Sequence, residues 1–148
     1  MRKIIVATAQ IAFLAGALSS GSAMAESVDI PILVPITGFI SLEGTAQRNG
    51  AVQALETPPA GVSVSYEVSD TSTSPEVAVN ALRRAISKGK PVAAAASIFG
   101  TQMLAMLPIA KRAGLPLITV SGTAKLTELG NPYIFRFFPG DAVVKVAH

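Results

Sequence analysis

Apolar positions recur in two alternating patterns after the first 25 residues. Apolar, β-branched or alternating runs predict five strands, at residues 28–36, 62–68, 91–96, 115–120 and 133–138. Apolar residues at helical spacing predict helices at residues 42–55, 75–88 and 101–113, one helical turn at 126–129, and a helix from residue 141. Strict alternation of strands and helices is typical of an α/β fold, an open and mostly parallel sheet with flanking helices.

Capping residues mark the boundaries of the helix at residues 75–88 most clearly. Ser74 is the expected N-cap, Pro75 occupies the first helical position and Gly89 follows the last turn. Its predicted apolar face consists of Ala78, Ala81, Leu82, Ala85 and Ile86.

The other two long helices are less regular in sequence. Ser41 is predicted as the N-cap of the helix at 42–55. The residues able to share an apolar face there are Ala46, Ala51, Ala54 and Leu55. Pro108 lies inside the helix at 101–113 and predicts a kink or a restart, because proline lacks the N–H and clashes with the preceding turn.

The first 25 residues have the pattern of a cleavable signal peptide. Arg2 and Lys3 precede an apolar stretch at residues 4–18, and an Ala-Met-Ala sequence at 23–25 predicts cleavage before Glu26. The apolar stretch is shorter than the roughly 20 residues that cross a bilayer, so no stable membrane insertion is expected after cleavage. Periplasmic export is therefore predicted.

Composition argues against several functional classes. Arg2 and Lys3 leave with the leader, so residues 26–148 keep ten basic and nine acidic residues, and nucleic acid is not an expected partner. The chain has no cysteine and its one histidine is the last residue, His148. Because no Cys- or His-based catalytic or metal site can be built from this set, we expect no metal, no cofactor and no enzymatic activity.

Small and hydroxyl-bearing residues follow three of the predicted strands. Open α/β sheets bind ligands beyond the carboxyl ends of their strands, where loops enter helices. The candidate ligand-binding residues in these loops are Phe39, Ser41, Ser97, Gly100, Ser121, Gly122 and Thr123. Hydroxyls and helix N-termini suit a carboxylate or a similar anion, although the same residues are also ordinary helix caps. Asp70 is interpreted as a loop or cap residue.

Short motifs in order along the chain resemble the branched-chain amino-acid (Leu/Ile/Val) type of periplasmic binding protein. They are Val-Pro-Ile-Thr-Gly at 34–38, Glu43-Gly44, 48–51, 67–70, 74–78, 114–118, Leu126-Thr127 and Phe135-Arg136. The resemblance implies a type I binding fold of two lobes that closes on a small amino acid or related amide and delivers it to an ABC transporter permease. By position it points to Ser97, Ser121 and Thr123, with main-chain groups near Gly100 and Gly122.

The resemblance also implies that residues 26–148 form only the N-terminal lobe, since the family continues into a second lobe. We expect this lobe alone to bind its solute weakly or not at all, because it leaves the ligand half exposed. A ligand-sensing domain of a receptor or regulator on the same fold is the alternative function. A small exported enzyme is a third, which lacks a useful histidine or cysteine.

Overall fold

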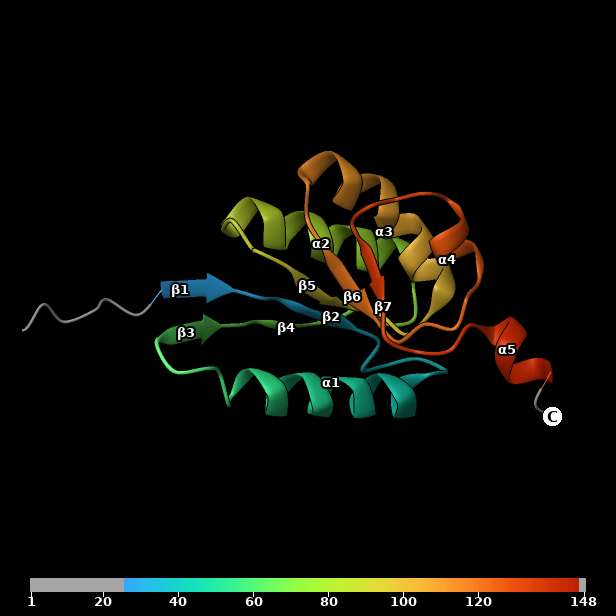
Figure 1. Cartoon of the computed structure of the whole chain (residues 1–148), viewed down its shortest axis with the longest axis horizontal. Helices are drawn as coiled ribbons and strands as arrows, with labels where there is room; N and C mark the ends of the chain where they lie inside the picture. Colours follow the sequence, from blue (N-terminus) through green and yellow to red (C-terminus); the bar gives the residue numbers. More distant parts are fainter. Residues whose placement is uncertain (1–25, 147–148) are drawn as a thin grey trace, which may run out of the picture.

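A computed structural model describes residues 26–146 of the protein, so the predicted signal peptide lies outside the described residues. The strands are β1 (Glu26–Asp29), β2 (Ile32–Val34), β3 (Val62–Ser65), β4 (Val68–Asp70), β5 (Ala94–Ala96), β6 (Leu117–Thr119) and β7 (Ile134–Arg136). The helices are α1 (Ser41–Leu55), α2 (Pro75–Lys88), α3 (Gly100–Ala113), α4 (Lys125–Glu128) and α5 (Asp141–Val146) (Figure 1). Within the described range, no helix has the length and apolar character needed to cross a membrane.

All strand pairs in the described residues are parallel. The main sheet has the order β4-β2-β5-β6-β7, and β1 pairs with β3 beside it. Val28 faces Val64 and Ile32 faces Val68, so one register runs through both pairs. Pro31 has no N–H to donate and separates β1 from β2. The first two predicted strands therefore follow the expected paths, each as two segments.

The order in which the chain adds strands to the sheet reverses next to β2. The chain places β4 on one side of β2 and then adds β5, β6 and β7 in turn on the other side. Helix α1 lies on one face of the sheet, and α2 and α3 lie on the other (Figure 1). This arrangement confirms the predicted α/β fold. The strand order reverses between β2 and β5, and open α/β sheets bind ligands at the carboxyl ends of the strands beside such a point.

The main core lies between the sheet and the α2–α3 layer. Its buried members are Leu33, Ala78, Ala81, Leu82, Ala94, Ala96, Met103, Met106, Leu107, Ala110, Leu115, Leu117 and Leu126. Helix α2 begins as predicted, since the Val77 N–H donates to Ser74 Oγ at 3.4 Å. Small alanines on β5 and α2 let these layers approach closely, which accounts for a core with few aromatic side chains.

Helix α1 differs from its prediction. Ile40 is the N-cap residue without a side-chain cap, and Ser41 is already the first helical residue. Ala46 and Ala54 of the predicted apolar face are exposed, and Gly44 is the buried residue of this helix. A β-carbon at Gly44 would overlap the main chain of Pro35. The helix therefore rests on the sheet through a glycine, which an apolar pattern does not reveal.

Helix α3 also departs from expectation at Pro108. The helix does not restart there and runs on to Ala113. One helical hydrogen bond to Leu104 is lost, but Pro108 is exposed and the neighbouring turns carry the buried contacts. Gly114 ends the helix in the left-handed conformation (φ 64°), as its position after the last turn predicts.

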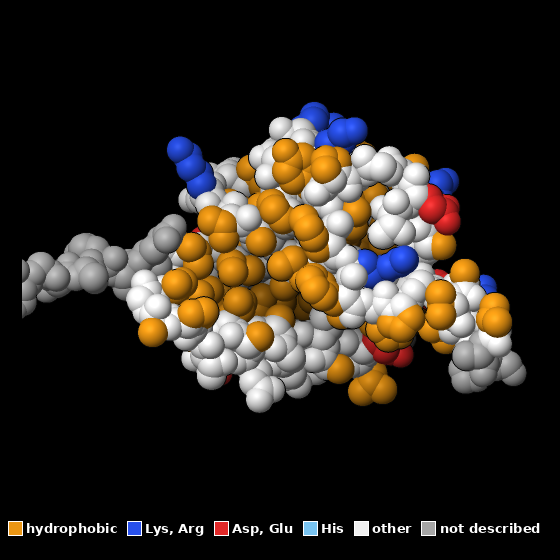
Figure 2. Space-filling model, in the orientation of Figure 1, with side chains coloured by type: hydrophobic (Ala, Val, Ile, Leu, Met, Phe, Trp, Pro, Cys, Tyr) orange, Lys and Arg blue, Asp and Glu red, His pale blue; other side chains and the backbone are white. Residues whose placement is uncertain are grey.

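One face of the sheet is covered near β2 and partly exposed over β6 and β7. Ile32, Ala95, Ile118 and Phe135 pair in a row across β2, β5, β6 and β7. Ile32, beside α1, is fully buried, whereas Ile118 is 39% and Phe135 46% exposed. Hydrophobic side chains gather on this face over the strands, next to α1 (Figure 2).

Candidate ligand-binding site

The loops that follow β2 and β5 meet at the carboxyl edge of the sheet. The Phe39 ring stands edge-on to the Phe99 ring, with the ring centroids 5.3 Å apart. Phe39 is 77% exposed. Ser41 lies at the start of α1, where its N–H donates to the Gly38 carbonyl oxygen at 3.2 Å. The structure therefore brings the first predicted loop beside the second.

Asp70, at the end of β4, ties these loops together. Its Oδ1 accepts hydrogen bonds from the N–H groups of Ile36 (2.8 Å), Thr37 (3.1 Å) and Ser72 (2.8 Å), and its Oδ2 accepts one from Thr37 Oγ1 (2.6 Å). Burial raises the pKa of Asp70, but the hydrogen bonds from Thr37, Ser72 and Ile36 outweigh it and lower the pKa from 3.8 to about 2. Asp70 is the last residue of β4 and so not a loop residue, but its carboxylate caps neighbouring main-chain N–H groups and stays ionised at neutral pH.

The segment after Asp70 is held in a strained conformation. Ser72 (φ 48°) and Thr73 (φ 55°) both adopt the left-handed region, which costs non-glycine residues free energy. Thr73 Oγ1 donates to the Thr37 carbonyl oxygen at 2.9 Å. Gly38 (φ 93°) lies against Thr73, where a β-carbon would overlap the threonine side chain. The loops after β2 and β4 therefore form one rigid unit.

Ser97, the first predicted residue after β5, is fully buried and bonded inside the protein. Its hydroxyl donates to Gln102 Oε1 at 2.5 Å and accepts from the Phe99 N–H at 3.0 Å. Gln102 Nε2 donates in turn to the carbonyl oxygens of Thr71 (2.9 Å) and Ser74 (3.1 Å). The Ser97 side chain therefore belongs to a network beneath the loop and does not line the hollow described next.

A hollow of about 400 Å³ opens beyond β5 and β6. Its lining residues are Ile98, Phe99, Gly100, Thr101, Leu104, Val120, Ser121, Gly122, Thr123, Phe138 and Asp141. Four of the seven predicted residues, Gly100, Ser121, Gly122 and Thr123, lie here together. The start of α3 leaves the N–H groups of Gly100 and Thr101 without helical acceptors at this hollow.

Ser121 has the most informative environment in the hollow. It is 1% exposed, and within the described residues its hydroxyl has no hydrogen-bond partner. Its main chain is held firmly, because the Ser121 N–H donates to Thr119 Oγ1 at 3.0 Å and that hydroxyl donates to the Ser97 carbonyl oxygen at 2.7 Å. A buried hydroxyl without a partner is unfavourable, so it marks a place where a ligand atom can supply one.

Two glycines let neighbouring side chains close on the hollow. A β-carbon at Gly100 would overlap the Thr123 side chain, and one at Gly122 would overlap the Asp141 carboxylate. The Asp141 N–H donates to the Gly122 carbonyl oxygen at 2.7 Å, and Arg136 Nη1 donates to that of Thr123 at 3.1 Å. Sequence reasoning missed Asp141 because its place beside the Ser121 loop arises only from strand pairing.

Sequence reasoning also missed Gln47 and Gln102. Gln47 Nε2 donates to the Ala96 carbonyl oxygen at 2.7 Å, and its Oε1 accepts from the Ile98 N–H at 2.8 Å. Gln102 is completely buried. Gln102 could have been noticed in the sequence as a polar residue among apolar ones on a predicted helix. No feature of the sequence distinguishes Gln47 in this way.

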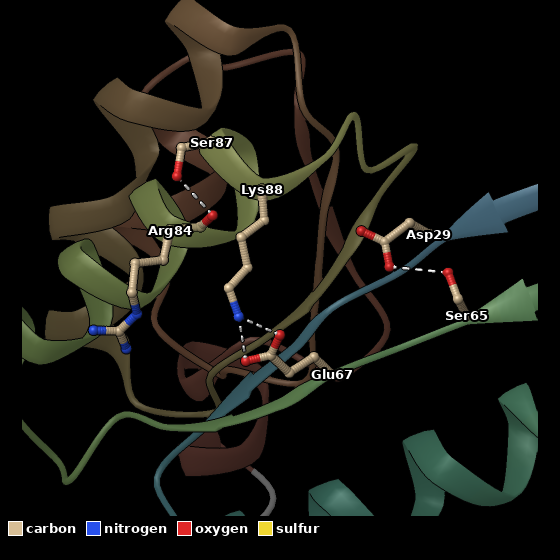
Figure 3. A network of polar contacts seen from close by, with 6 residues as sticks. All are labelled: Asp29, Ser65, Glu67, Arg84, Ser87 and Lys88. Carbon is tan, nitrogen blue, oxygen red and sulfur yellow. Dashed lines mark hydrogen bonds and ion pairs between the residues drawn. The ribbon is translucent and has the colours of Figure 1, made fainter.

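A charged cluster lies at the opposite edge of the sheet (Figure 3). Lys88 Nζ pairs with Glu67 Oε2 at 2.8 Å, and Asp29 Oδ1 accepts from Ser65 Oγ at 3.2 Å. The hydrogen bond and charge of Lys88 lower the pKa of Glu67. Exposed ion pairs contribute little to stability, and none of the predicted site residues lies in this cluster.

Comparison with known proteins gives the family of the chain. A profile described as "Periplasmic binding protein" matches residues 27–146. The chain belongs to the periplasmic binding protein family. A comparison with curated proteins gives no match. Among residues 26–146, no three His, Cys, Asp or Glu side chains are grouped to hold a metal ion.

Several solved structures are similar to the chain along most of its length. A leucine-binding protein (LivK) of Thermotoga maritima is 31% identical, with a TM-score of 0.74 over 81% of this chain and 35% of its own. The Streptococcus pneumoniae protein LivJ, in complex with isoleucine, is 23% identical, with a TM-score of 0.74 over 79% and 35%. A Rhodopseudomonas palustris solute-binding protein with 3,4-dihydroxybenzoic acid is 24% identical, with a TM-score of 0.68 over 74% and 31%. The chain spans about a third of the length of these three proteins.

Proposed function

We propose that this chain is the N-terminal lobe of the solute-binding component of an ABC transporter. In this proposal it is exported to the periplasm, captures a branched-chain or other small amino acid or a related amide, and presents it to the permease. The family match along residues 27–146 and the 31% identity to a leucine-binding protein support this function.

The observation that carries the proposal is the Ser121 hydroxyl. This hydroxyl is buried and lacks a partner within the described residues, and Ser121 lines a hollow together with Gly100 and Thr101 at the start of α3. The first-turn N–H groups and the helix dipole favour a negative charge at this point. The hollow therefore suits the carboxylate of a solute, with Ser121 and Thr123 as hydroxyl contacts.

The rest of the hollow suits an apolar body attached to that carboxylate. Phe99, Leu104 and Phe138 line it along with Ile98 and Val120. The solutes named for the neighbours, leucine, isoleucine and a dihydroxybenzoic acid, all join a carboxylate to an apolar part. A small amino acid has the size and the charge that this arrangement can hold.

Ser121→Ala tests the proposal. We expect affinity to fall about 10- to 100-fold, because a hydrogen bond to a charged group contributes about 1.5–3 kcal/mol. Stability should stay equal or rise, since the variant removes a buried hydroxyl that has no hydrogen-bond partner among residues 26–146. Calorimetric titration of the whole gene product with a panel of amino acids and aromatic acids measures the affinity.

Ser63→Ala is the matched control, because Ser63 is exposed on β3 and its side chain lies away from the hollow. This variant should bind as the unsubstituted protein does. Unchanged affinity in Ser121→Ala would contradict the assigned site. A protein that binds no member of the panel would contradict the proposed solute class.

A further inference from the structure

Gln47 reaches from α1 to the point where β5 ends. Its carboxamide donates to the Ala96 carbonyl oxygen (2.7 Å) and accepts from the Ile98 N–H (2.8 Å). Both contacts span about 50 residues of sequence, between a helix on one face of the sheet and a loop at its edge (Figure 1). Gln47 lies one turn after Gly44 on the same helix face, and the close approach of Gly44 to Pro35 brings the carboxamide within reach.

The pair of bonds has the pattern of a parallel β-ladder. In such a ladder, one residue of a strand donates to the carbonyl oxygen before a given partner residue and accepts from the N–H after it. The Gln47 carboxamide does the same around Ser97, which lies between Ala96 and Ile98. A side chain therefore extends the pairing of β5 by one residue beyond the end of the strand.

This extension decides which main-chain groups remain for a ligand. The Ile98 N–H is bonded to Gln47, and the Phe99 N–H is bonded to Ser97 Oγ. The N–H groups of Gly100 and Thr101 are the next ones along, and both residues line the hollow. Gln102 holds Ser97 from the interior while Gln47 holds its flanking main chain, so the β5–α3 loop is fixed from two sides.

We propose that Gln47 is a positioning residue of the solute site. It holds residues 96–98 in the conformation that aims the first turn of α3 at the ligand, without touching the ligand itself. This inference rests on the proposed function, because it concerns the same hollow.

Gln47→Glu and Gln47→Met test the inference, with Gln53→Ala as the matched control. Glutamate keeps the acceptor for the Ile98 N–H but sets an oxygen against the Ala96 carbonyl, and methionine removes both bonds at similar length. Gln53 is an exposed glutamine on the same helix, and its side chain makes no hydrogen bond in the described residues. The whole gene product is titrated with L-leucine, L-isoleucine and 3,4-dihydroxybenzoic acid, and amide exchange at Ile98 and thermal unfolding are measured.

We expect both Gln47 variants to bind about tenfold more weakly or worse at a temperature where they are folded. The Ile98 amide should exchange faster in Gln47→Met, and Gln53→Ala should match the unsubstituted protein in all three measurements. A Gln47 variant that exchanges faster at Ile98 but keeps its affinity would overturn the positioning role and leave the proposed function intact. An unsubstituted protein that binds none of the three solutes would overturn the proposed function and this inference with it.

Discussion

Gly100 controls how closely the two main loops of the site approach each other. It begins α3, and Thr123 from the loop after β6 occupies the space that its side chain would need. A larger residue would push Thr123 away from the hollow. The glycine is thus required by a contact between loops and not by its own backbone angles.

Gly100→Ala should therefore reduce both stability and solute affinity. Overpacking a well-fitted contact typically costs about 1–3 kcal/mol, so we expect a loss of this size in the free energy of unfolding. Urea unfolding measures the stability, and calorimetry measures the affinity. Gly50→Ala is the control, since nothing lies within 4 Å of a β-carbon at this α1 position. It should raise stability by about 0.5–1 kcal/mol through helix propensity, and equal effects of both variants would contradict this account.

Single residues also show where sequence reasoning reaches its limit. Ser97 and Ser121 both follow a parallel strand and precede a helical segment, so the sequence predicts the same ligand-binding role for both. In the structure the Ser97 hydroxyl is bonded to Gln102, whereas the buried Ser121 hydroxyl has no hydrogen-bond partner in the part of the chain that the structure describes. The difference depends on a glutamine from α3 that reaches one serine and not the other.

At the scale of elements, the carboxylate of Asp70 joins the ends of β2 and β4. The loop that carries Phe39 has no buried apolar anchor of its own, because residues 37–39 are exposed. Its conformation depends on the hydrogen bonds from Ile36 and Thr37 to Asp70. Hydrogen bonds to an ionised carboxylate therefore fix this loop, whereas apolar packing fixes other parts of the fold.

Asp70→Asn should destabilise the protein by about 1–3 kcal/mol at neutral pH, because a neutral amide lacks the charge that strengthens the hydrogen bonds from the N–H groups of Ile36, Thr37 and Ser72. The pKa of Asp70 is about 2 when folded, below its ordinary value of 3.8. Its contribution to stability is therefore present above about pH 4 and is lost as the pH falls towards 2. Urea unfolding at a series of pH values should show the difference between the two proteins shrink over this window. Glu43→Gln, which replaces an exposed carboxyl on α1, is the control, and a difference independent of pH would contradict the mechanism.

The elements differ in how well their sequence predicted them. The bounds of α2 are those predicted, because Ser74, Pro75 and Gly89 are local signals that act through neighbouring backbone groups. The predicted apolar face of α1 was wrong at Ala46 and Ala54, which are exposed, because this helix meets the sheet through Gly44 and through the Gln47 carboxamide. A contact made through a glycine, which has no side chain, or through a polar side chain adds no residue to the apolar pattern of a helix. The apolar pattern therefore does not predict such contacts.

At the scale of the whole molecule, the apolar face of β6 and β7 is the main departure from an evenly covered sheet. Ile118 and Phe135 are neighbours across two strands and are both more than a third exposed. Helix α1 covers the same row of side chains only near β2. Adjacent exposed apolar side chains of this kind form a surface that favours apolar contact.

Residues 26–148 should accordingly bind ANS, a dye that fluoresces on apolar surfaces, while folded. The double variant Ile118→Thr and Phe135→Thr should lower this fluorescence, since threonine keeps the β-propensity and reduces the apolar area. Leu42→Gln removes an exposed leucine (80%) on α1, away from the row, and should leave the signal nearly unchanged. Fluorescence that is the same in all three proteins would show that the dye binds elsewhere.

Local features of the sequence were enough to predict much of the fold of this protein. Apolar periodicity and capping residues specified the α/β class, the order of the elements and the loops at one edge of the sheet. Tertiary structure alone decided which polar groups in those loops remain for a ligand, because hydrogen bonds from other elements of the fold occupy some of them. Gln102 bonds the Ser97 hydroxyl and Gln47 bonds the Ile98 N–H, whereas within the described range the Ser121 hydroxyl has no partner. Such partners lie tens of residues apart or on other elements, and a linear pattern does not record them.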